Sequence, residues 1–206
     1  MAARRPRLTA PRRLLAVVVL LALLAPAAAR AVVFRYYPYR HRAEVERLAA
    51  QYRFDPFLLA AVIRTESKFD PRALSQRGAR GLMQVMPETG KWAAANLGLP
   101  NFQDDALYDP STNLLIGTWY LAELRREFGG DLILTLAAYN GGGRNVKDWL
   151  ASNQWTGTHE TLEQIPFRET RDFVQRVLVD YRRYVWLYDG GGRCLTRDWP
   201  FWPAPR

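Results

Sequence analysis

The feature that most constrains this chain is the way proline and glycine cut it into short helical segments. In the stretch Asp55–Phe69, Asp55 can accept hydrogen bonds from the free N–H groups of a first turn, and Pro56 suits the first helical position. Asp70-Pro71 ends this stretch, because a residue before proline disfavours helical dihedral angles. Asp109-Pro110 repeats the same start further along the chain. These start and stop signals favour an assembly of short helices.

Apolar residues within these segments recur at spacings of three and four, as they do on one face of a helix. The predicted helices are 40–52, 55–69, 87–96, 109–128, 131–139, 145–150 and a last helix that begins at Pro166. Residues 72–80, 98–108 and 151–164 are predicted loops, and 32–38 is predicted to be an extended lead-in. No stretch alternates convincingly as a strand does. We therefore expect one mainly α domain, large enough to bury a core by packing alone.

Glu66 lies in line with the apolar face of its predicted helix, because Val62 and Ile63 precede it at helical spacing. Two effects disfavour a charge there: the apolar wall excludes water, and the carbonyl end of a helix is partially negative. A carboxyl group so placed can stay protonated near neutral pH and act as a general acid. Most glutamates with this spacing only mark the edge of a helix's solvated face. Glu66 is a candidate that needs support from other motifs.

Residues 1–29 have the composition of a segment that directs export. Met1–Arg13 carries five arginines and no acid, Leu14–Ala25 is a run of twelve apolar residues, and Pro26 with three alanines follows. This order of basic start, apolar core and small-residue exit is typical of a secretory signal peptide. The run is short of the ~20 residues of a membrane span, although the alanines narrow the gap. We expect a signal peptide or a membrane anchor through residues 14–29, and a domain exported to the outer face of the cytoplasmic membrane or beyond.

The composition argues against nucleic-acid and metal chemistry. The formal charge of +9 falls to +4 without residues 1–29 and their five arginines. Such a mild, dispersed charge predicts weak attraction to an anionic envelope and no nucleic-acid partner. Cys194 is the single cysteine, and with the isolated His41 and His159 it makes no metal site. We expect no metal and no cofactor.

Four further sites carry polar groups that a simple connecting segment would not need. Ser75 lies in the loop after Glu66, Gly81-Leu-Met-Gln84 brings backbone and an amide together, Tyr139-Asn140 ends an apolar helix, and Glu169 lies in the first turn of the last helix. Structural explanations exist for each, such as a core ring at Tyr139 or an acid that complements a helix N-terminus at Glu169. No one of these motifs assigns a function alone.

Together these segments resemble one family, the lytic transglycosylase catalytic domain. The resemblance rests on the order and spacing of Glu66-Ser67, Ser75, Gly81-Leu-Met-Gln-Val-Met-Pro87, Ala138-Tyr-Asn140 and Ile165-Pro-Phe-Arg-Glu-Thr-Arg171. The likeness is to the C-terminal domain of soluble lytic transglycosylases, a lysozyme-like fold related to goose-type lysozyme. It implies a single helical domain with a substrate groove over residues 30–188. The aromatic and proline-rich tail, 189–206, lies outside the likeness. We expect it to fold back over apolar surface, and the alternative is a lip that stacks on sugars or lies on a membrane surface.

The resemblance implies that peptidoglycan glycan strands are the substrate and that Glu66 is the catalytic residue. Glu66 would act as an acid and then as a base, leaving 1,6-anhydromuramoyl ends. The implied substrate-binding residues are Ser75, Gln84, Met86, Tyr139, Asn140 and Glu169. Of these, Tyr139 would orient Glu66, Met86 would form an apolar floor, and Glu169 would line the groove. No protein partner is indicated.

One residue departs from the family pattern: Gly141 follows the Tyr-Asn pair, where the family usually has alanine. The change removes no functional group. Three alternatives stay open from the sequence: a hydrolytic lysozyme of the same fold, a non-catalytic peptidoglycan-binding module, and a structural part of an envelope machine.

Overall fold

The computed structural model describes residues 10–189, and the chain divides into two compact units, Met1–Tyr39 and Arg40–Arg206. The aromatic tail predicted for residues 189–206 lies outside the described residues, apart from Asp189. The two units are described separately.

In the first unit, helix α1 spans Ala10–Tyr36 and contains Pro26. Its stretch Val18–Tyr36 is long and apolar enough to cross a membrane by length and composition, a test that signal sequences also pass. The prediction of an extended lead-in at 32–38 is wrong, because α1 continues through Tyr36 and the Tyr37 amide still donates to the Val33 carbonyl at 2.8 Å. The apolar run and the lead-in thus form one continuous helix.

In its described part the second unit consists of helices joined by loops, which confirms the predicted mainly α fold class. Its elements are α2 (Arg42–Tyr52), α3 (Pro56–Ser67), α4 (Pro87–Leu97), η1 (Asp104–Tyr108), α5 (Pro110–Glu127), α6 (Leu132–Gly141), α7 (Gly143–Ala151), η2 (His159–Gln164) and α8 (Arg168–Tyr188). Within residues 10–189 the only β-type pairing consists of the isolated bridges Leu74–Arg80 and Arg80–Val85. This pairing closes the loop that connects α3 to α4.

The helix starts follow the predicted capping. The side chain of Asp55 accepts a hydrogen bond from the Phe57 amide, and that of Asp109 accepts one from the Thr112 amide. The boundaries differ from prediction by one or two residues in several helices, and the differences that matter lie after α5. Helix α6 continues to Gly141, and α7 begins at Gly143. Gly142 alone separates them, and its φ of 88° suits glycine. Helix α8 begins at Arg168, and the predicted loops 98–108 and 151–164 each contain a short 3₁₀ helix.

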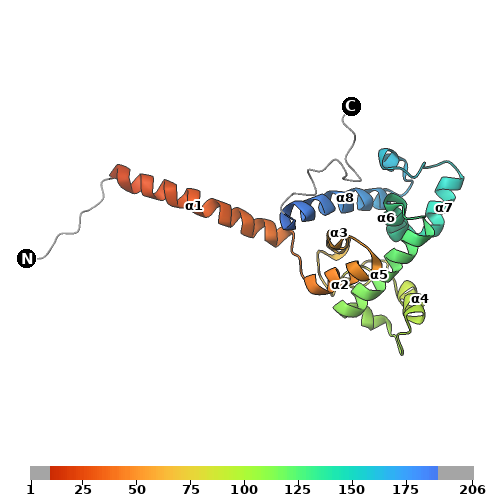
Figure 1. The fold of residues 1–206 in the computed structure, drawn as a ribbon. Coiled ribbons are helices and arrows are strands. Elements are labelled where there is room, and N and C mark those ends of the chain that lie inside the picture. The colour runs from red at the N-terminus through yellow and green to blue at the C-terminus, as the bar shows by residue number, and fades with distance from the viewer. Residues whose placement is uncertain (1–9, 190–206) are drawn as a thin grey trace, which may run out of the picture. The chain divides into compact units, whose positions relative to one another are not determined.

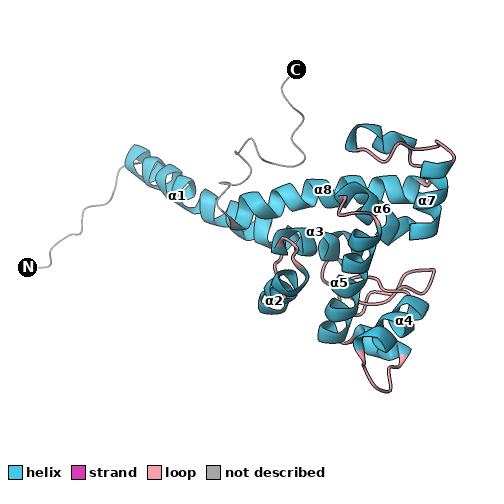
Figure 2. Ribbon diagram, turned by 45° about the vertical axis from the view of Figure 1, so that its right-hand side comes forward, coloured by secondary structure: helices cyan, strands magenta, loops and turns pink. Residues whose placement is uncertain are grey.

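The core of the second unit lies where α8 packs along α3 and reaches α6 (Figures 1 and 2). Every residue of α3 from Phe57 to Ile63 is buried, as expected for a helix that is apolar all round. Helix α8 contributes one apolar stripe, formed by Phe173, Val174, Val177, Tyr181, Tyr184 and Val185. The last turn of α3, which carries Glu66, is thereby fixed against the centre of the domain.

A buried ion pair also joins α3 to α8. Arg64 Nη1 donates to Asp180 Oδ2 at 2.6 Å, and the Asp180 side chain is only 4% exposed. Breaking such a pair by removing one partner is costly, because the other charge stays buried. Since Arg64 lies two residues before Glu66, the pair fixes the helix end at the candidate site.

Candidate active site

Glu66 lies in the last turn of α3, and its neighbour Ser67 fastens that turn to the loop before α4. Ser67 Oγ makes contacts with two carbonyl oxygens, Ile63 O at 3.1 Å and Leu82 O at 2.7 Å. The helix ends at Lys68 in the left-handed region. Glu66 is half-buried as a residue. It is not among the residues that line the cavity described below.

The surroundings of Glu66 favour its neutral form. Burial is the largest cause and, with the nearby negative charge of Glu169, raises its pKa to about 8; Arg176 acts in the opposite direction. The sequence had suggested the apolar wall and the carbonyl end of the helix. Burial is thus a cause of the raised pKa that both the sequence and the structure indicate. The effect of the Glu169 charge could be seen only in the folded chain.

The loop from Gly81 to Met86 is held against α5 by one buried amide. Asn113 Oδ1 accepts from the Met83 amide at 2.8 Å, and Asn113 Nδ2 donates to the carbonyls of Arg80 and Leu107, each at 2.8 Å. Gly81 has a φ of 75°, and a Cβ there would lie 2.2 Å from the Leu107 carbonyl oxygen. Only glycine fits this approach. Gly81 is therefore required for the shape of the loop, and the same loop carries Gln84.

Tyr139 lies at the end of α6 and crosses to this loop. Its hydroxyl group donates to the Met83 carbonyl at 2.9 Å, and its ring packs between Tyr120 at 5.5 Å and Phe173 at 6.4 Å. Burial, followed by the charge of Glu66, raises the pKa of Tyr139 well above its usual value. The phenol therefore stays protonated next to Glu66. Because its proton goes to Met83, its oxygen is the atom available to accept a hydrogen bond.

A cavity of about 270 Å³ brings four of the predicted site residues together. It is lined by Gln84, Val85, Met86, Thr89, Tyr120, Tyr139, Asn140, Gly141 and Gly142. Gln84 adopts a positive φ of 47°, and its side-chain Nε2 donates to the carbonyls of Ala73 and Gly81. With both amide hydrogens so used, its carbonyl oxygen is the group left for a ligand.

Asn140 is fixed by Thr170, a residue of α8 that the sequence did not single out. Thr170 Oγ1 donates to Asn140 Oδ1 at 2.9 Å, which leaves the Asn140 amide hydrogens for the cavity. A Cβ at Gly141 would lie 2.8 Å from the same Thr170 Oγ1. The departure from the family's usual alanine therefore has a physical reason: the buried threonine occupies the space that a methyl group would need.

Ser75 and Glu169 are joined through the loop that follows α3, and neither lines the cavity. Ser75 Oγ accepts from the Ala79 amide at 2.9 Å, closing a turn that carries Arg77. Arg77 Nη1 lies 3.2 Å from Glu169 Oε2, and both side chains are more than half exposed. Ser75 thus shapes a turn, and Glu169 acts on Glu66 through its charge.

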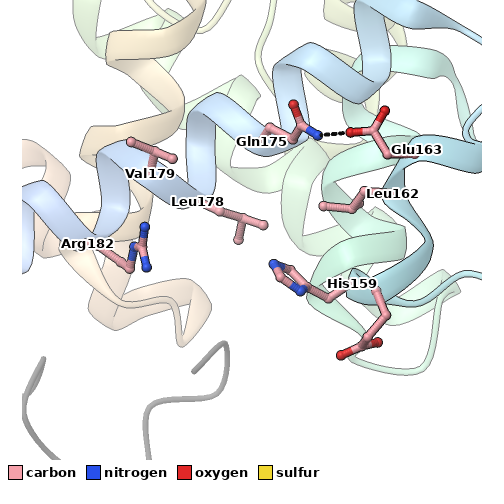
Figure 3. Close-up of a pocket in the computed structure, with 8 residues that line it drawn as sticks. His159, Leu162, Glu163, Gln175, Leu178, Val179 and Arg182 are labelled. Atoms are coloured by element: carbon pink, nitrogen blue, oxygen red, sulfur yellow. Dashed lines mark hydrogen bonds between the residues drawn. The ribbon is translucent and has the colours of Figure 1, made fainter. Parts of the chain in front are cut away.

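A larger cavity, of about 490 Å³, lies between η2 and α8 (Figure 3). It is lined by His159, Glu160, Leu162, Glu163, Gln175, Leu178, Val179 and Arg182, none of which is a predicted site residue. Arg171 Nη1 and Gln175 Nε2 donate to the Glu163 carboxylate at 3.1 and 2.7 Å, the second being the dashed line in Figure 3. These bonds lower the pKa of Glu163. This larger cavity thus contains a carboxylate that is stabilised as an anion, whereas no described residue that lines the smaller cavity has a carboxylate.

The residues that sequence reasoning missed are those that hold the site from a distance. Asn113 lies four residues after the cap Asp109, and neither that position nor the residue type indicated its three hydrogen bonds. Thr170 lies next to Glu169 within a recognised motif, so the motif was the available signal. Arg77 had no signal, because a single exposed arginine in a polar loop is ordinary.

The fold and this groove define a helical, lysozyme-like domain with one buried carboxyl group beside a phenol and two amides. Residues 44–162, more than half of the chain, match the family described as Transglycosylase SLT domain. The chain belongs to this family.

Individual proteins agree with that assignment. The chain is 41% identical over 119 residues to a putative soluble lytic murein transglycosylase of Haemophilus influenzae, covering 57% of this chain and 20% of that protein. It is 32% identical over 159 residues to the membrane-bound lytic murein transglycosylase C of Edwardsiella ictaluri, covering 69% and 42%. An inactive glutamate-to-glutamine mutant of the lytic transglycosylase Slt from Pseudomonas aeruginosa superposes with a TM-score of 0.66 at 34% identity, covering 74% of this chain and 25% of that one. The chain thus spans less than half the length of these relatives.

Proposed function

We propose that this domain is a peptidoglycan lytic transglycosylase. It cleaves the bond between N-acetylmuramic acid and N-acetylglucosamine and closes a 1,6-anhydro ring on the muramoyl side. The observation that carries the proposal is the carboxyl group of Glu66, whose pKa is raised to about 8 in a chain of the Transglycosylase SLT family. The Pseudomonas aeruginosa relative is inactive as a glutamate-to-glutamine mutant, which is the effect expected where one carboxyl group carries the chemistry.

Glu66 acts first as a general acid. With a pKa of about 8 it is roughly 90% protonated at pH 7. It gives this proton to the glycosidic oxygen as the bond from that oxygen to C1 of the muramoyl sugar breaks. The positive charge that develops at C1 is stabilised by the carbonyl oxygen of the substrate's own N-acetyl group. The N-acetylglucosamine unit leaves as an alcohol.

Glu66, now an anion, acts next as a base. It takes the proton of the C6 hydroxyl while O6 attacks C1, so one C–O bond forms for the one that broke. The carboxyl group ends protonated, as it began, and no water is consumed. Serving as acid and then base requires a pKa near the working pH, and burial of the carboxyl group provides it.

The neighbours of Glu66 orient the groups that react. We expect the Tyr139 oxygen to accept a hydrogen bond from the protonated Glu66 in the complex with substrate, since its own proton is donated to Met83. The Gln84 carbonyl and the Asn140 amide bind the sugar and its N-acetyl group. Ser75 contributes to sugar binding at the turn that it closes.

Two further residues shape the groove around the reacting sugar. Met86, which is 41% exposed, forms part of the apolar floor. We expect Glu169, which lies outside the cavity, to line the wider groove, and its charge adds to burial in favouring the protonated form of Glu66.

The test is to digest isolated cell-wall sacculi with the purified full-length chain and to weigh the released muropeptides. Anhydro products, lighter by one water than hydrolysis products, are expected from the wild type and absent with Glu66→Gln. Glu163→Gln is the matched control, because it removes an exposed carboxylate on the other cavity. Wild-type digestion by Glu66→Gln would refute the assignment.

A hydrolytic lysozyme is the second candidate, favoured by the electrostatic contact between Glu66 and a second carboxylate, Glu169. Most glycosidases use two carboxylates. Glu169 is, however, more than half exposed and paired with Arg77, so it lacks the sheltered position of a nucleophile or base. Products carrying the mass of an added water would decide for hydrolysis.

We also propose that the domain works outside the cytoplasm, delivered or anchored by residues 14–29. The apolar helix α1 supports this proposal. N-terminal sequencing of the protein recovered from cell fractions distinguishes the two outcomes: a start near residue 30 indicates a cleaved signal, and an intact start in the membrane fraction indicates an anchor.

A further inference from the structure

A line of aromatic rings leads away from the Glu66 site along α5 to α4. Tyr139 contacts Tyr120 at 5.5 Å between ring centroids, Tyr120 contacts Trp92 at 6.1 Å, and Trp92 contacts Trp119 at 4.8 Å. The four rings come from three helices, α6, α5 and α4. The contacts begin at Tyr139, on which the charge of Glu66 acts, and end at Trp92 and Trp119, which do not line the cavity.

The outer end of this line is open to solvent. Trp92 is 49% exposed although it packs against Trp119 and Tyr120. Single exposed apolar residues are ordinary, but an exposed ring continuous with a binding groove marks a binding surface. Thr89 lines the cavity, and Trp92 follows it at a spacing of three on α4, so the two share a helix face. Trp92 therefore lies one helical turn beyond Thr89, on the same face of α4 and outside the cavity.

The size of the cavity leaves room for such a continuation. At about 270 Å³ it lies just below the volumes, roughly 300–1,000 Å³, that enclose a small ligand. A glycan strand is a polymer, so most of its sugars must rest on surface beyond the cavity. A pyranose ring presents a face of C–H groups, with its hydroxyls at the rim, and this face lies favourably on the face of a flat aromatic ring.

We propose that Trp92, supported by Trp119, forms a stacking subsite for one saccharide unit of a glycan strand whose reacting sugar lies at Glu66. This inference rests on the proposed function and adds a specificity-determining residue to it. Tyr120 belongs to both the cavity and the ring line, so it joins the two binding surfaces. Strands long enough to reach Trp92 bind more tightly than short fragments that fill only the cavity.

The experiment compares Trp92→Ala, Trp92→Phe and wild type on glycan strands of many disaccharides and on fragments of one or two disaccharides. Trp92→Ala raises KM for long strands by about 5- to 10-fold, the size of one lost aromatic contact, with kcat unchanged. KM for the short fragments stays as in the wild type, and Trp92→Phe restores most of the loss. Trp186→Ala is the matched control, because Trp186 is also exposed, at 65%, and lies on α8.

A KM for long strands that Trp92→Ala leaves unchanged overturns the inference, and so does an equal loss on long and short substrates, which indicates a structural role. The same comparison is made by binding, with Trp92→Ala introduced into Glu66→Gln and affinity measured for N-acetylglucosamine oligomers of increasing length. A length-dependent gain in affinity that disappears with Trp92→Ala supports the subsite. If wild type releases no muropeptide, the proposed function fails, and these affinities still decide the subsite.

Discussion

The groove cavity beside Tyr139 and the cavity between η2 and α8 differ in a way that their sizes do not predict. The second is the larger, about 490 against about 270 Å³, and it is lined by two glutamates. Its Glu163 is exposed and held as an anion by Arg171 and Gln175. Glu66 does not itself line the smaller cavity, but its charge acts on Tyr139, which does. Burial raises the pKa of Glu66 to about 8.

The comparison shows that the size of a cavity and the ability of a nearby carboxyl group to donate a proton are independent properties. A carboxylate that donors stabilise as an anion binds cations and amides but has no proton to give at neutral pH. A carboxyl group whose charge is disfavoured by burial carries a proton that it can donate. The sign of the pKa shift therefore identifies the candidate active site where cavity volume points elsewhere. The following variants test that contrast.

The largest expected effect is on activity. Glu66→Gln preserves shape and removes the titrating proton, so release of soluble muropeptides should fall by about 10³-fold, within the range that general acid–base catalysis contributes. Glu163→Gln should leave the rate within about twofold. The rates are measured from turbidity loss of sacculi at pH 7, with circular dichroism to confirm folding. Equal losses from the two variants would remove the distinction between the cavities.

The next effect is on stability and uses a similar contrast between a buried and an exposed acid on α8. Asp180→Asn leaves the charge of Arg64 without its buried carboxylate and should cost about 3 kcal/mol of unfolding free energy. Asp172→Asn is the control, because Asp172 is 43% exposed and lies 3.7 Å from Arg168, and it should cost under about 0.5 kcal/mol. Urea denaturation with unchanged m-values measures both losses. Similar midpoints for the two variants would contradict the role given to the pair.

The sequence predicted the helices well because their signals are local. Asp55 and Asp109 each cap the helix that they precede, and the position of Glu66 on the apolar face follows from spacing alone. The contacts that complete the site join residues far apart in the chain. Tyr139 reaches Met83 across 56 positions, and Arg64 reaches Asp180 across 116. No periodicity encodes such pairs.

The family resemblance supplied part of what spacing could not. It named Gln84, Met86, Tyr139 and Asn140, which the structure brings to one cavity. It included Thr170 in the Ile165–Arg171 motif without giving that residue a role, and it did not include Trp92. Such residues belong to this chain's own packing, where the space near Gly141 is filled from α8 and an exposed ring extends the groove.

A smaller effect is expected in the pH dependence of stability. Glu66 ionises near its usual pKa when the chain is unfolded and only near pH 8 when it is folded, so the unfolded state binds fewer protons in between. Stability is therefore lost as pH rises from about 4.5 to 8. Glu66→Gln removes this loss and should stabilise the protein by about 1–3 kcal/mol at pH 9, and scarcely at pH 4.

Thermal melting across that pH range measures this effect, and Glu163→Gln serves as its counterpart. Because the pKa of Glu163 is lowered in the folded protein, its contribution is present above the unfolded pKa and is lost as pH falls through the folded value. Removing that carboxylate should thus lower the melting temperature slightly at pH 9. Shifts of the same sign in the two variants would contradict the opposite environments assigned to the two glutamates.

The smallest effect concerns the charges around Glu66. The anion of Glu169 raises the pKa of Glu66, and the cation of Arg176 lowers it. In a profile of kcat/KM against pH, the limb that falls near pH 8 should move by about a few tenths of a unit to lower pH in Glu169→Gln and to higher pH in Arg176→Gln. Both displacements should shrink in 0.5 M salt, since exposed charges are screened. The double variant should return the limb toward pH 8, because the two charges act on one proton. A limb that neither variant moves would mean that a group other than Glu66 controls it.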